Sequence, residues 1–320
     1  MGHLLEGKWS FTDHLKESEA GLYKKKPSLY RGQVTSDGAS GYKAEVNRYV
    51  LYSSVACPWA HRAVIFRVLK KLESIIELVN TEQTPAAMGW AFSQGAHHIP
   101  GTDRKVNYLH EIYAFGDPGC TTRVTVPCLW DSKTSTVVSN ESSDIIRMFN
   151  SEFDQIAPSS PDYSPVERRK EIDLMNDRVL NEINNGVNES GRSTGQEAYE
   201  VSVEKLFSAL DGFEDILSRQ RYLLGDKVTE CDWRFYPNLL RFDPIYYVGY
   251  KCNIRHLEEY PNLSNYLRDL YQTPGIADVS DVQEIKRQVF GPCGPIASNG
   301  IVPRGPIVDL MRPHDRDRFG

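Results

Sequence analysis

The sequence has few residues of the kinds that indicate a disulfide scaffold, a membrane span or a nucleic-acid surface. Six cysteines in 320 residues are too sparse for a disulfide framework, and 37 Lys and Arg against 43 Asp and Glu leave a net charge of -6. Without a basic surplus, binding to phosphate backbones is excluded as a main function. No uncharged apolar stretch approaches the roughly 18 residues of a membrane span, and the N-terminus lacks the apolar core of a secretory signal. We therefore expect a cytoplasmic protein with no nucleic-acid or membrane partner.

The chain contains material for two folded domains. Apolar residues make up 40% and aromatic residues 11% of the sequence, enough for a buried core in each. The first half alternates strand and helix patterns, whereas the second half shows helical periodicity throughout. The predicted boundaries are an N-terminal extension at 1–45, an α/β domain at 46–150 with an irregular insertion at 81–123, a Pro- and Ser-rich linker at 151–164, an all-α domain at 165–289 and a C-terminal tail at 290–320.

Short-range patterns predict individual elements within these domains. Runs of β-forming residues predict strands at 48–54, 75–79, 125–130 and 136–139, and helical patterns lie at 59–72 and 140–148. In the second domain, apolar residues at helical spacing predict helices over 166–186, 197–219, 232–248 and 261–272. Thr229 followed three residues later by Asp232 is typical of a helix start with a capping box.

Cys57 lies between a predicted strand and a helix that begins near Pro58. Backbone N–H groups and the positive end of the helix dipole stabilise a thiolate at such a position, and the thiolate is the nucleophilic form of cysteine. The position three residues on, where a Cys-x-x-Cys redox pair has its second thiol, is Ala60. Turnover at Cys57 would therefore need an external thiol. Without its neighbours, a cysteine before a proline is usually just a small buried residue.

Two further features follow in the chain order of a thioredoxin-like domain. Val126-Pro127 begins a later strand, where such folds hold a cis proline opposite the active cysteine and where Val126 would offer its backbone to a thiol peptide. Glu141-Ser142 opens a helix, where a hydroxyl and N–H groups can bind a carboxylate and Glu141 can hold an ammonium. Glutathione carries both groups at its γ-glutamyl end. Taken singly, the proline fits an edge strand and Glu141-Ser142 fits plain helix capping, but the three features in this order favour a functional site.

The strings that carry these features resemble one protein family. Residues 57–62 (CPWAHR), 123–127 (RVTVP) and 139–142 (SNES) are similar to glutathionyl-hydroquinone reductases, the Xi class of glutathione transferases. Further matches lie at 184–187 (NNGV), 196–199 (QEAY), 241–243 (RFD), 251–253 (KCN) and the C-terminal RFG. The resemblance covers nearly the whole chain. It implies a thioredoxin-like N-terminal domain followed by a helical-bundle C-terminal domain, which is the glutathione-transferase architecture, and a homodimer.

The resemblance also implies a role for each predicted site residue. Cys57 is the nucleophile, and Tyr246 is a tyrosine near it whose hydroxyl would donate to the thiolate. The implied glutathione contacts are Trp90, Arg123, Val124, Thr125, Val126, Glu141 and Ser142, with main-chain bonds from Val126 and a γ-glutamyl anchor at Glu141 and Ser142. The implied reaction removes glutathione from a glutathionyl-hydroquinone through a Cys57–glutathione mixed disulfide, which a second glutathione resolves. Glutathione is the expected co-substrate, glutathionylated aromatic molecules are the expected partners, and no metal is expected.

The chain departs from the family pattern on the electrophile side of the site. Asn188 stands where the family has a tyrosine, Gln288-Val289 where it has His-Tyr, and Pro292 where it has an arginine. A pocket without those groups would be more apolar. We therefore expect Asn188 and Val289 to face the electrophile, and specificity to be broadened towards substrates of the Omega class such as glutathionyl-acetophenones.

Two other functions stay open on the sequence. A conjugating glutathione transferase normally activates the thiol with Tyr or Ser at the position of Cys57, so the cysteine disfavours that function. A non-catalytic, ligandin-like binder of aromatic compounds fits the altered electrophile side and would be indifferent to Cys57→Ser. His97-His98 invites a metal site, but no second pair at ligand spacing accompanies it.

Overall fold

The chain forms two compact units in the computed structural model, which describes residues 2–11, 18–19, 22–23, 27–84, 88–296 and 299–319. Unit 1 comprises residues 1–16, 27–161 and 287–301, and unit 2 comprises residues 17–26, 162–286 and 302–320. The main division, between 161 and 162, falls inside the stretch predicted as a linker. Residues 287–301 belong to unit 1 although they follow the helices of unit 2.

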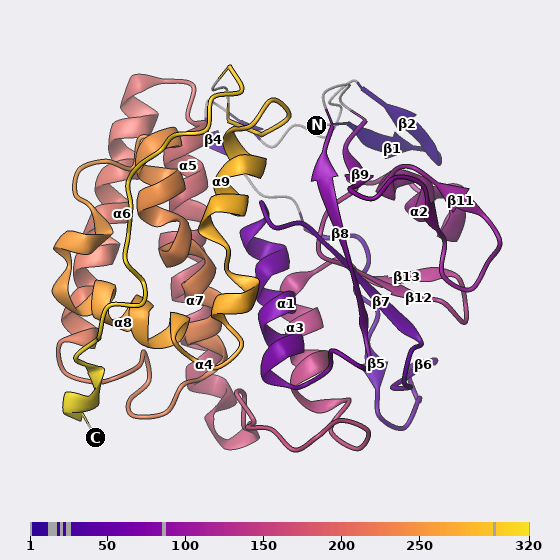
Figure 1. The fold of residues 1–320 in the computed structure, drawn as a ribbon, viewed down its shortest axis with the longest axis horizontal. Helices are drawn as coiled ribbons and strands as arrows, with labels where there is room; N and C mark the ends of the chain where they lie inside the picture. Colours follow the sequence, from indigo (N-terminus) through magenta and orange to yellow (C-terminus); the bar gives the residue numbers. More distant parts are fainter. Residues whose placement is uncertain are drawn as a thin grey trace. The chain divides into compact units, whose positions relative to one another are not determined.

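A five-stranded mixed sheet forms the centre of unit 1 (Figure 1). Its strands, in spatial order, are β13 (Thr136–Ser139), β12 (Cys128–Asp131), β7 (Tyr49–Ser53), β8 (Glu77–Gln83) and β9 (Trp90–Phe92). β7 and β8 are parallel and are joined by the crossover helix α1 (Pro58–Leu69), whereas the other neighbours are antiparallel. Every residue of β7 is buried, as expected for a central strand. The strands and the first helix predicted here are confirmed.

Helices cover both faces of this sheet. α1 and α3 (Ser142–Ser151) pack together on one face, and α2 (Leu109–Gly116) lies on the other (Figure 1). The prediction that residues 81–123 form no regular element is wrong, because the stretch contains β9, α2 and the short pair β10 (His97–His98) and β11 (Lys105–Val106). α2 was missed because its eight residues give little more than two turns of periodicity between loops rich in Gly and Pro.

The N-terminal segment adds short strands to the described parts of both units. The pairs are β1 (His3–Leu5) with β2 (Lys8–Ser10) and β5 (Val34–Thr35) with β6 (Tyr42–Lys43) in unit 1, and β3 (Ser18–Glu19) with β4 (Leu22–Tyr23) in unit 2. Leu4 of β1 exchanges two backbone hydrogen bonds with Thr122, at 2.8 and 3.0 Å, which ties this end of the chain to the body of unit 1. Parts of the predicted extension, at 12–17, 20–21 and 24–26, lie outside the described residues.

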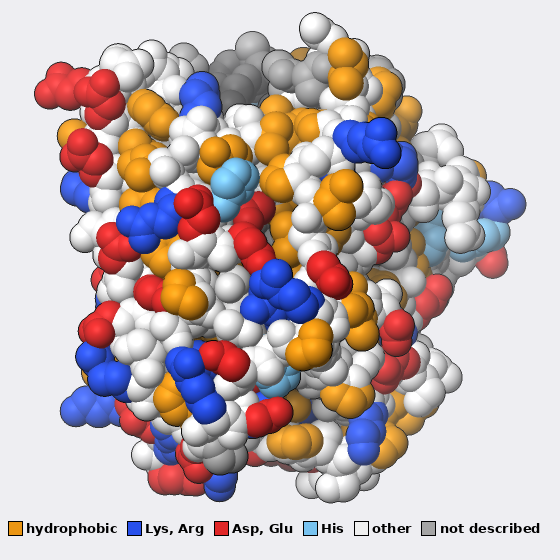
Figure 2. Space-filling view, turned by 60° about the vertical axis from the view of Figure 1, so that its left-hand side comes forward, with side chains coloured by type: hydrophobic (Ala, Val, Ile, Leu, Met, Phe, Trp, Pro, Cys, Tyr) orange, Lys and Arg blue, Asp and Glu red, His pale blue; other side chains and the backbone are white. Residues whose placement is uncertain are grey.

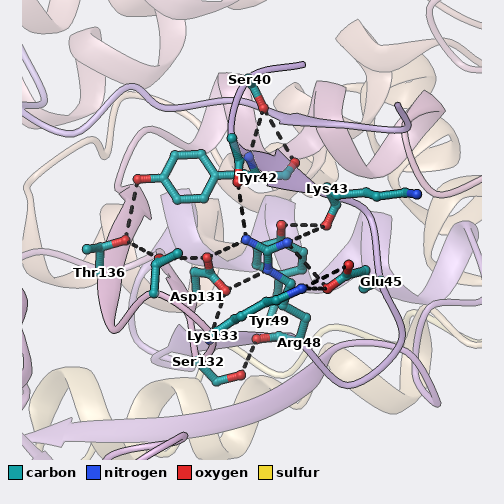
Figure 3. Close-up of polar contacts among 12 residues, drawn as sticks. Ser40, Tyr42, Lys43, Glu45, Arg48, Tyr49, Asp131, Ser132, Lys133 and Thr136 are labelled. Carbon is teal, nitrogen blue, oxygen red and sulfur yellow. Dashed lines mark hydrogen bonds and ion pairs between the residues drawn. The ribbon is translucent and has the colours of Figure 1, made fainter. Parts of the chain in front are cut away.

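A buried ion pair joins the start of β7 to the end of β12 (Figure 3). The Arg48 guanidinium donates to both carboxylate oxygens of Asp131, from Nε at 2.8 Å and from Nη2 at 2.7 Å. The two side chains are 6% and 0% exposed. Arg48 also donates to the Gly41 carbonyl, and the Lys133 N–H donates to Asp131. Two-point geometry with little access to water makes this a strong contact between adjacent strands.

Unit 2 is helical. Its α-helices are α4 (Arg169–Arg178), α5 (Asn185–Arg192), α6 (Gln196–Leu217), α7 (Glu230–Arg241), α8 (Pro261–Tyr271) and α9 (Val282–Phe290), whose last turn belongs to unit 1. π-helical segments lie at Val179–Asn184 and Phe242–Tyr247, and 3-10 helices at Val166–Arg168, Leu257–Glu259, Ala277–Val279 and Arg316–Phe319. The four helical stretches predicted here are confirmed. So is the cap before α7, where the Thr229 N–H donates to Asp232 at 2.7 Å.

The surface carries charges of both signs. Lys and Arg side chains are interspersed with Asp and Glu on the face shown in Figure 2, in keeping with the small net charge of -6. Within the described ranges, no helix combines the length and the apolar character that crossing a membrane requires.

Candidate active site

Cys57 is the N-cap residue of α1. Its extended backbone (φ -89°, ψ 115°) leads the chain from β7 into the helix, and Pro58 takes a first-turn position where its missing N–H leaves no bond unmade. The sulfur accepts the Ala60 N–H at 3.4 Å and donates to the Val126 carbonyl at 3.4 Å. The half-buried thiol thus has a backbone donor and a backbone acceptor within reach. The Ala60 N–H and the helix N-terminus favour the thiolate, whereas the Val126 carbonyl accepts the proton of the neutral thiol.

The segment before β12 brings a second predicted part of the site to this thiol. The Val126–Pro127 peptide bond is cis, so the structure has the proline that thioredoxin-like folds place opposite the active cysteine. Thr125, the residue before Val126, is held by two neighbouring side chains. The Tyr113 hydroxyl donates to the Thr125 carbonyl at 2.8 Å, and Asn140 Nδ2 donates to Thr125 Oγ1 at 3.3 Å. The loop therefore presents the Val126 carbonyl to the sulfur from a fixed position.

A cavity of about 290 Å³ lies in unit 1 next to this loop. Trp90 and Val124, two of the predicted glutathione contacts, line it together with Trp9, Pro292 and Cys293. Its volume approaches the lower end of the roughly 300–1,000 Å³ typical of small-molecule sites. Trp90 and Val124 also belong to the buried cluster against which the predicted nucleophile packs. The structure thus brings these three predicted residues together.

Sequence patterns did not reveal that Trp9 and Cys293, near the two ends of the chain, line the cavity. Trp9 lies on β2 and stacks on His110 of α2, with ring centroids 4.4 Å apart. Pro292 and Cys293 come from the segment after α9; the family resemblance had placed Pro292 on the electrophile side of the site, whereas Cys293 was expected only in a tail. A tryptophan in an extension and a Gly- and Pro-rich segment carry no local pattern that would assign them to a pocket.

Glu141 and Ser142 lie at the start of α3, as predicted. Glu141 is the N-cap residue, and its carboxylate accepts the Ser143 N–H at 3.3 Å and the Ser28 hydroxyl at 2.9 Å. Ser142 is 2% exposed, and its hydroxyl donates to Glu141 at 3.4 Å. The capping role that the sequence left open is therefore present. The role of the pair as a γ-glutamyl anchor stays a prediction.

The last turn of α9 contributes a polar side chain that the sequence analysis noted only as a departure from the family. Gln288 Oε1 accepts hydrogen bonds from the Ser54 hydroxyl at 3.1 Å and from the Ala56 N–H at 3.2 Å. The next residue, Val289, is 4% exposed and apolar. Arg123 is half-buried in the loop before β12. The predicted contacts of Val289 with the electrophile and of Arg123 with glutathione stay predictions.

Tyr246 and Asn188 lie in unit 2, and their approach to the thiol stays a prediction from the family resemblance. Tyr246 lies in the π-helical segment that follows α7; it is 4% exposed and packs against the rings of Phe242 and Tyr250. Asn188 lies in α5, and its Nδ2 donates to the Asn184 carbonyl at 2.8 Å. The amide of Asn188 is thus turned onto its own helix.

Other thiols and histidines have ordinary surroundings. Burial raises the pKa of Cys128 to about 12 and that of Cys252 to about 12, so both stay protonated and weakly nucleophilic at neutral pH. No disulfide joins the six cysteines, all of which the structure describes. His97 Nε2 lies 3.1 Å from the Tyr52 hydroxyl, and the described part of the chain holds no group of three or more potential metal ligands.

Two family profiles match the chain. Residues 56–152 match the profile described as "Glutathione S-transferase, N-terminal domain", and residues 196–269 match "Glutathione S-transferase, C-terminal domain". The chain is 41% identical to glutathionyl-hydroquinone reductase YqjG of Escherichia coli K12, over 100% of both chains. A Xi-class glutathione transferase from Natrialba magadii matches with a TM-score of 0.89 and 38% identity, over 100% of this chain and 97% of that one. The chain belongs to the Xi class of glutathione transferases.

Further relatives of this Xi-class transferase extend the comparison. The glutathione-bound structure of YqjG matches with a TM-score of 0.87 and 39% identity, over 99% of each chain. Glutathione S-transferase omega-like 2 of Schizosaccharomyces pombe is 37% identical over 92% of this chain and 96% of its own. The predicted family is confirmed, and so is the predicted fold class, a thioredoxin-like N-terminal domain followed by a helical-bundle C-terminal domain.

Proposed function

We propose that this Xi-class transferase is a glutathione-dependent reductase that removes glutathione from glutathionyl-hydroquinones. One observation carries the proposal: the Cys57 sulfur caps α1, 3.4 Å from the Ala60 N–H and 3.4 Å from the Val126 carbonyl beside the cis proline. The name of YqjG, a glutathionyl-hydroquinone reductase of similar sequence, supports the substrate class. Ala60 in the place of a second thiol supports a mechanism that takes its resolving thiol from solution.

The reaction has two steps. The Cys57 thiolate attacks the sulfur of the glutathionyl-hydroquinone, the sulfur–carbon bond breaks, and its electron pair goes to the ring carbon, which takes up a proton. This gives free hydroquinone and a Cys57–glutathione mixed disulfide. A second glutathione, as its thiolate, attacks the glutathione sulfur, which yields oxidised glutathione and restores the Cys57 thiolate. The thiol proton of the second glutathione balances the proton gained by the ring. Tyr246 is the proposed hydroxyl donor near the sulfur.

The proposed glutathione site lies in unit 1. The residues that we assign to it are Trp90 and Val124 on the cavity wall, Arg123, Thr125 and Val126 in the loop before β12, and Glu141 and Ser142 at the start of α3. A carboxylate and a serine hydroxyl at a helix N-terminus suit the ammonium and carboxylate of the γ-glutamyl group. We further propose that the protein acts as a homodimer in the cytoplasm, where glutathione is kept reduced.

The electrophile side of the site supports broadened specificity. Val289 is a buried aliphatic side chain, and Pro292 lines the cavity. The Asn188 amide already donates to its own helix. Because the site has fewer hydroxyl and cationic donors for a hydroquinone than the family pattern, we expect it also to accept ketone-bearing thioethers such as glutathionyl-acetophenones. Asn188→Tyr with Val289→Tyr should raise the preference for the hydroquinone, measured as the ratio of the two kcat/KM values; an unchanged ratio would contradict this assignment.

The test is steady-state reduction of glutathionyl-menadione and glutathionyl-acetophenone by wild type, Cys57→Ser and the matched control Cys120→Ser. We expect turnover to vanish in Cys57→Ser and to persist in the control, whose thiol is 4% exposed and lies in the loop between α2 and β12 rather than at a helix start. Wild type incubated with substrate and no free glutathione should gain the mass of one glutathione on Cys57. Wild type without turnover of either substrate, but with aromatic ligands still bound, would replace the proposal by a non-catalytic ligandin-like role.

A further inference from the structure

The loop that carries Cys57 is anchored by a side chain from the opposite end of the chain. Gln288 Oε1 accepts one hydrogen bond from the Ser54 hydroxyl at 3.1 Å and another from the Ala56 N–H at 3.2 Å. These donors come from residues three and one positions before the cysteine. A single amide oxygen therefore uses its acceptor capacity on two points of one short loop.

The loop at residues 54–57 is a tight turn, and the hydrogen bond that closes it does not involve the Ala56 N–H. The Cys57 N–H donates to the Ser54 carbonyl at 3.0 Å, which closes residues 54–57 as in a β-turn. The Ala56 N–H is not part of that closure and needs an acceptor from elsewhere. Ser54 is 1% exposed, so its hydroxyl also needs a partner inside the protein. Gln288 is that acceptor for both groups.

Gln288 is itself held on the body of unit 1. Its neighbour Arg287 forms an ion pair with Glu82 of β8, with Nη2 and Oε1 3.0 Å apart. The Ile296 N–H donates to the Val289 carbonyl at 3.3 Å, which folds the following segment back against the end of α9. The Gln288 side chain therefore stands on α9, which is linked to β8, and β8 is the neighbour of β7, the strand that leads to Cys57. A rigid support of this kind holds a reacting group more precisely than its own loop could.

We propose that Gln288 is a positioning residue for Cys57, and that its amide oxygen holds the sulfur between the Ala60 N–H and the Val126 carbonyl. This inference rests on the proposed function, because the position of the sulfur matters only if Cys57 is the nucleophile. Gln288 acts through its hydrogen bonds to Ser54 and Ala56 on the loop that carries the sulfur. It keeps the sulfur on its line of attack, where a displacement of about 1 Å can cost about a hundredfold in rate. Gln288 is not among the residues that line the cavity, so the loss should fall on kcat rather than on KM.

The test uses a double-mutant cycle with a control on the same helix. Gln288→Met keeps the length of the side chain and removes the acceptor, and Ser54→Ala removes one of the two donors. The control is Gln283→Met, since Gln283 is exposed and its hydrogen bond to Asp281 comes from the backbone. The readouts are kcat and KM for glutathionyl-menadione, the rate at which iodoacetamide alkylates Cys57, followed by peptide mass spectrometry, and the thermal unfolding midpoint.

We expect Gln288→Met to lower kcat about tenfold and to slow alkylation of Cys57, with KM within about twofold of wild type. Ser54→Ala should have a smaller effect of the same kind, and Gln283→Met should match wild type. Adding Ser54→Ala to Gln288→Met should cost less than it does in wild type, because both changes remove the same contact. Additive effects, or a loss confined to KM, would overturn the positioning role.

Cys57→Ser separates this inference from the function on which it rests. If Cys57→Ser keeps its turnover, the proposed function fails whatever Gln288 does. If Cys57→Ser is inactive while Gln288→Met has the kcat of wild type, the positioning role is refuted and the reductase stands. If Gln288→Met unfolds at too low a temperature for kinetic measurements, Ser54→Ala tests the positioning role instead. An unchanged kcat and an unchanged alkylation rate of Cys57 in Ser54→Ala would refute that role.

Discussion

Removing the Arg48 guanidinium should destabilise unit 1 while leaving the site competent. Arg48→Met keeps an apolar side chain of similar reach and leaves the buried Asp131 carboxylate with the Lys133 N–H at 3.1 Å and the Thr134 hydroxyl at 2.7 Å as donors. Breaking a buried pair from one side costs about 3–5 kcal/mol. Because two donors to Asp131 remain, we expect a loss at the lower end of this range, about 3 kcal/mol of unfolding free energy. Unit 1 would then open roughly a hundredfold more often than in wild type.

Hydrogen-exchange mass spectrometry measures this loss in unit 1 separately from unit 2. Peptides that span β7 and β12 should exchange roughly a hundredfold faster in Arg48→Met, whereas peptides of α6 and α8 should not change. The matched control is Arg219→Met, which breaks a pair with Asp215 whose side chains are 64% and 63% exposed and which should cost less than about 1 kcal/mol. At temperatures where the variant is folded, kcat should stay near that of wild type, because the pair lies at the ends of β7 and β12 opposite to Cys57. Equal, small effects of the two substitutions would refute the reasoning.

The ion pair between Arg48 and Asp131 also predicts that the stability of unit 1 depends on pH. Burial alone would raise the pKa of Asp131, but hydrogen bonds from Arg48, Thr134 and the Lys133 N–H outweigh it and hold the pKa below its usual value. A carboxyl with a depressed pKa stabilises the fold above its unfolded pKa, about 3.9, and loses that contribution as the pH falls through the folded value. The difference between wild type and Arg48→Met should therefore be full at pH 7 and shrink towards pH 3. A difference independent of pH would assign the loss to packing instead.

Three further outcomes follow from single contacts. Glu141→Gln should raise KM for glutathione about tenfold, since the ammonium of the γ-glutamyl group would lose a charged partner, and an unchanged KM would remove the proposed anchor. Burial lowers the pKa of His110, so the fold favours the neutral imidazole. The stack of His110 on Trp9 should therefore weaken as the pH falls below the unfolded pKa of about 6.5. Hydrogen exchange in β1 and β2 should then become faster in wild type and not in His110→Phe. Arg316 donates to the Leu217 carbonyl at the end of α6 and to the Arg221 carbonyl in the segment after it, so Arg316→Met should cost unit 2 about 2 kcal/mol in unfolding free energy. Arg318→Met, at a half-exposed side chain, should cost clearly less; equal thermal midpoints of the two variants would contradict this.

The elements that depend on neighbouring residues were predictable from the sequence. β7 is a run of β-forming residues, α1 shows helical spacing after a proline, and the cap at Thr229 needs only the next three residues. The same holds for Cys57 at a helix start, which depends on the residues on either side of it. α2 marks the limit of this approach, because eight residues between irregular loops contain too little periodicity to stand out.

A cysteine at a helix start without a second thiol, a later Val-Pro and an all-helical second half therefore predicted the fold from the sequence alone, and the strings that resemble the family predicted the Xi class. Tertiary structure alone decided which residues far apart in the chain meet, at the thiol and elsewhere in unit 1. Gln288 and Ser54 are 234 positions apart, and Arg48 and Asp131 are 83 apart. Trp9 and Cys293 reach one cavity from the two ends of the chain. Such partners are chosen by how strands and helices pack, and the residues that meet share no spacing along the chain, so no local pattern could reveal them.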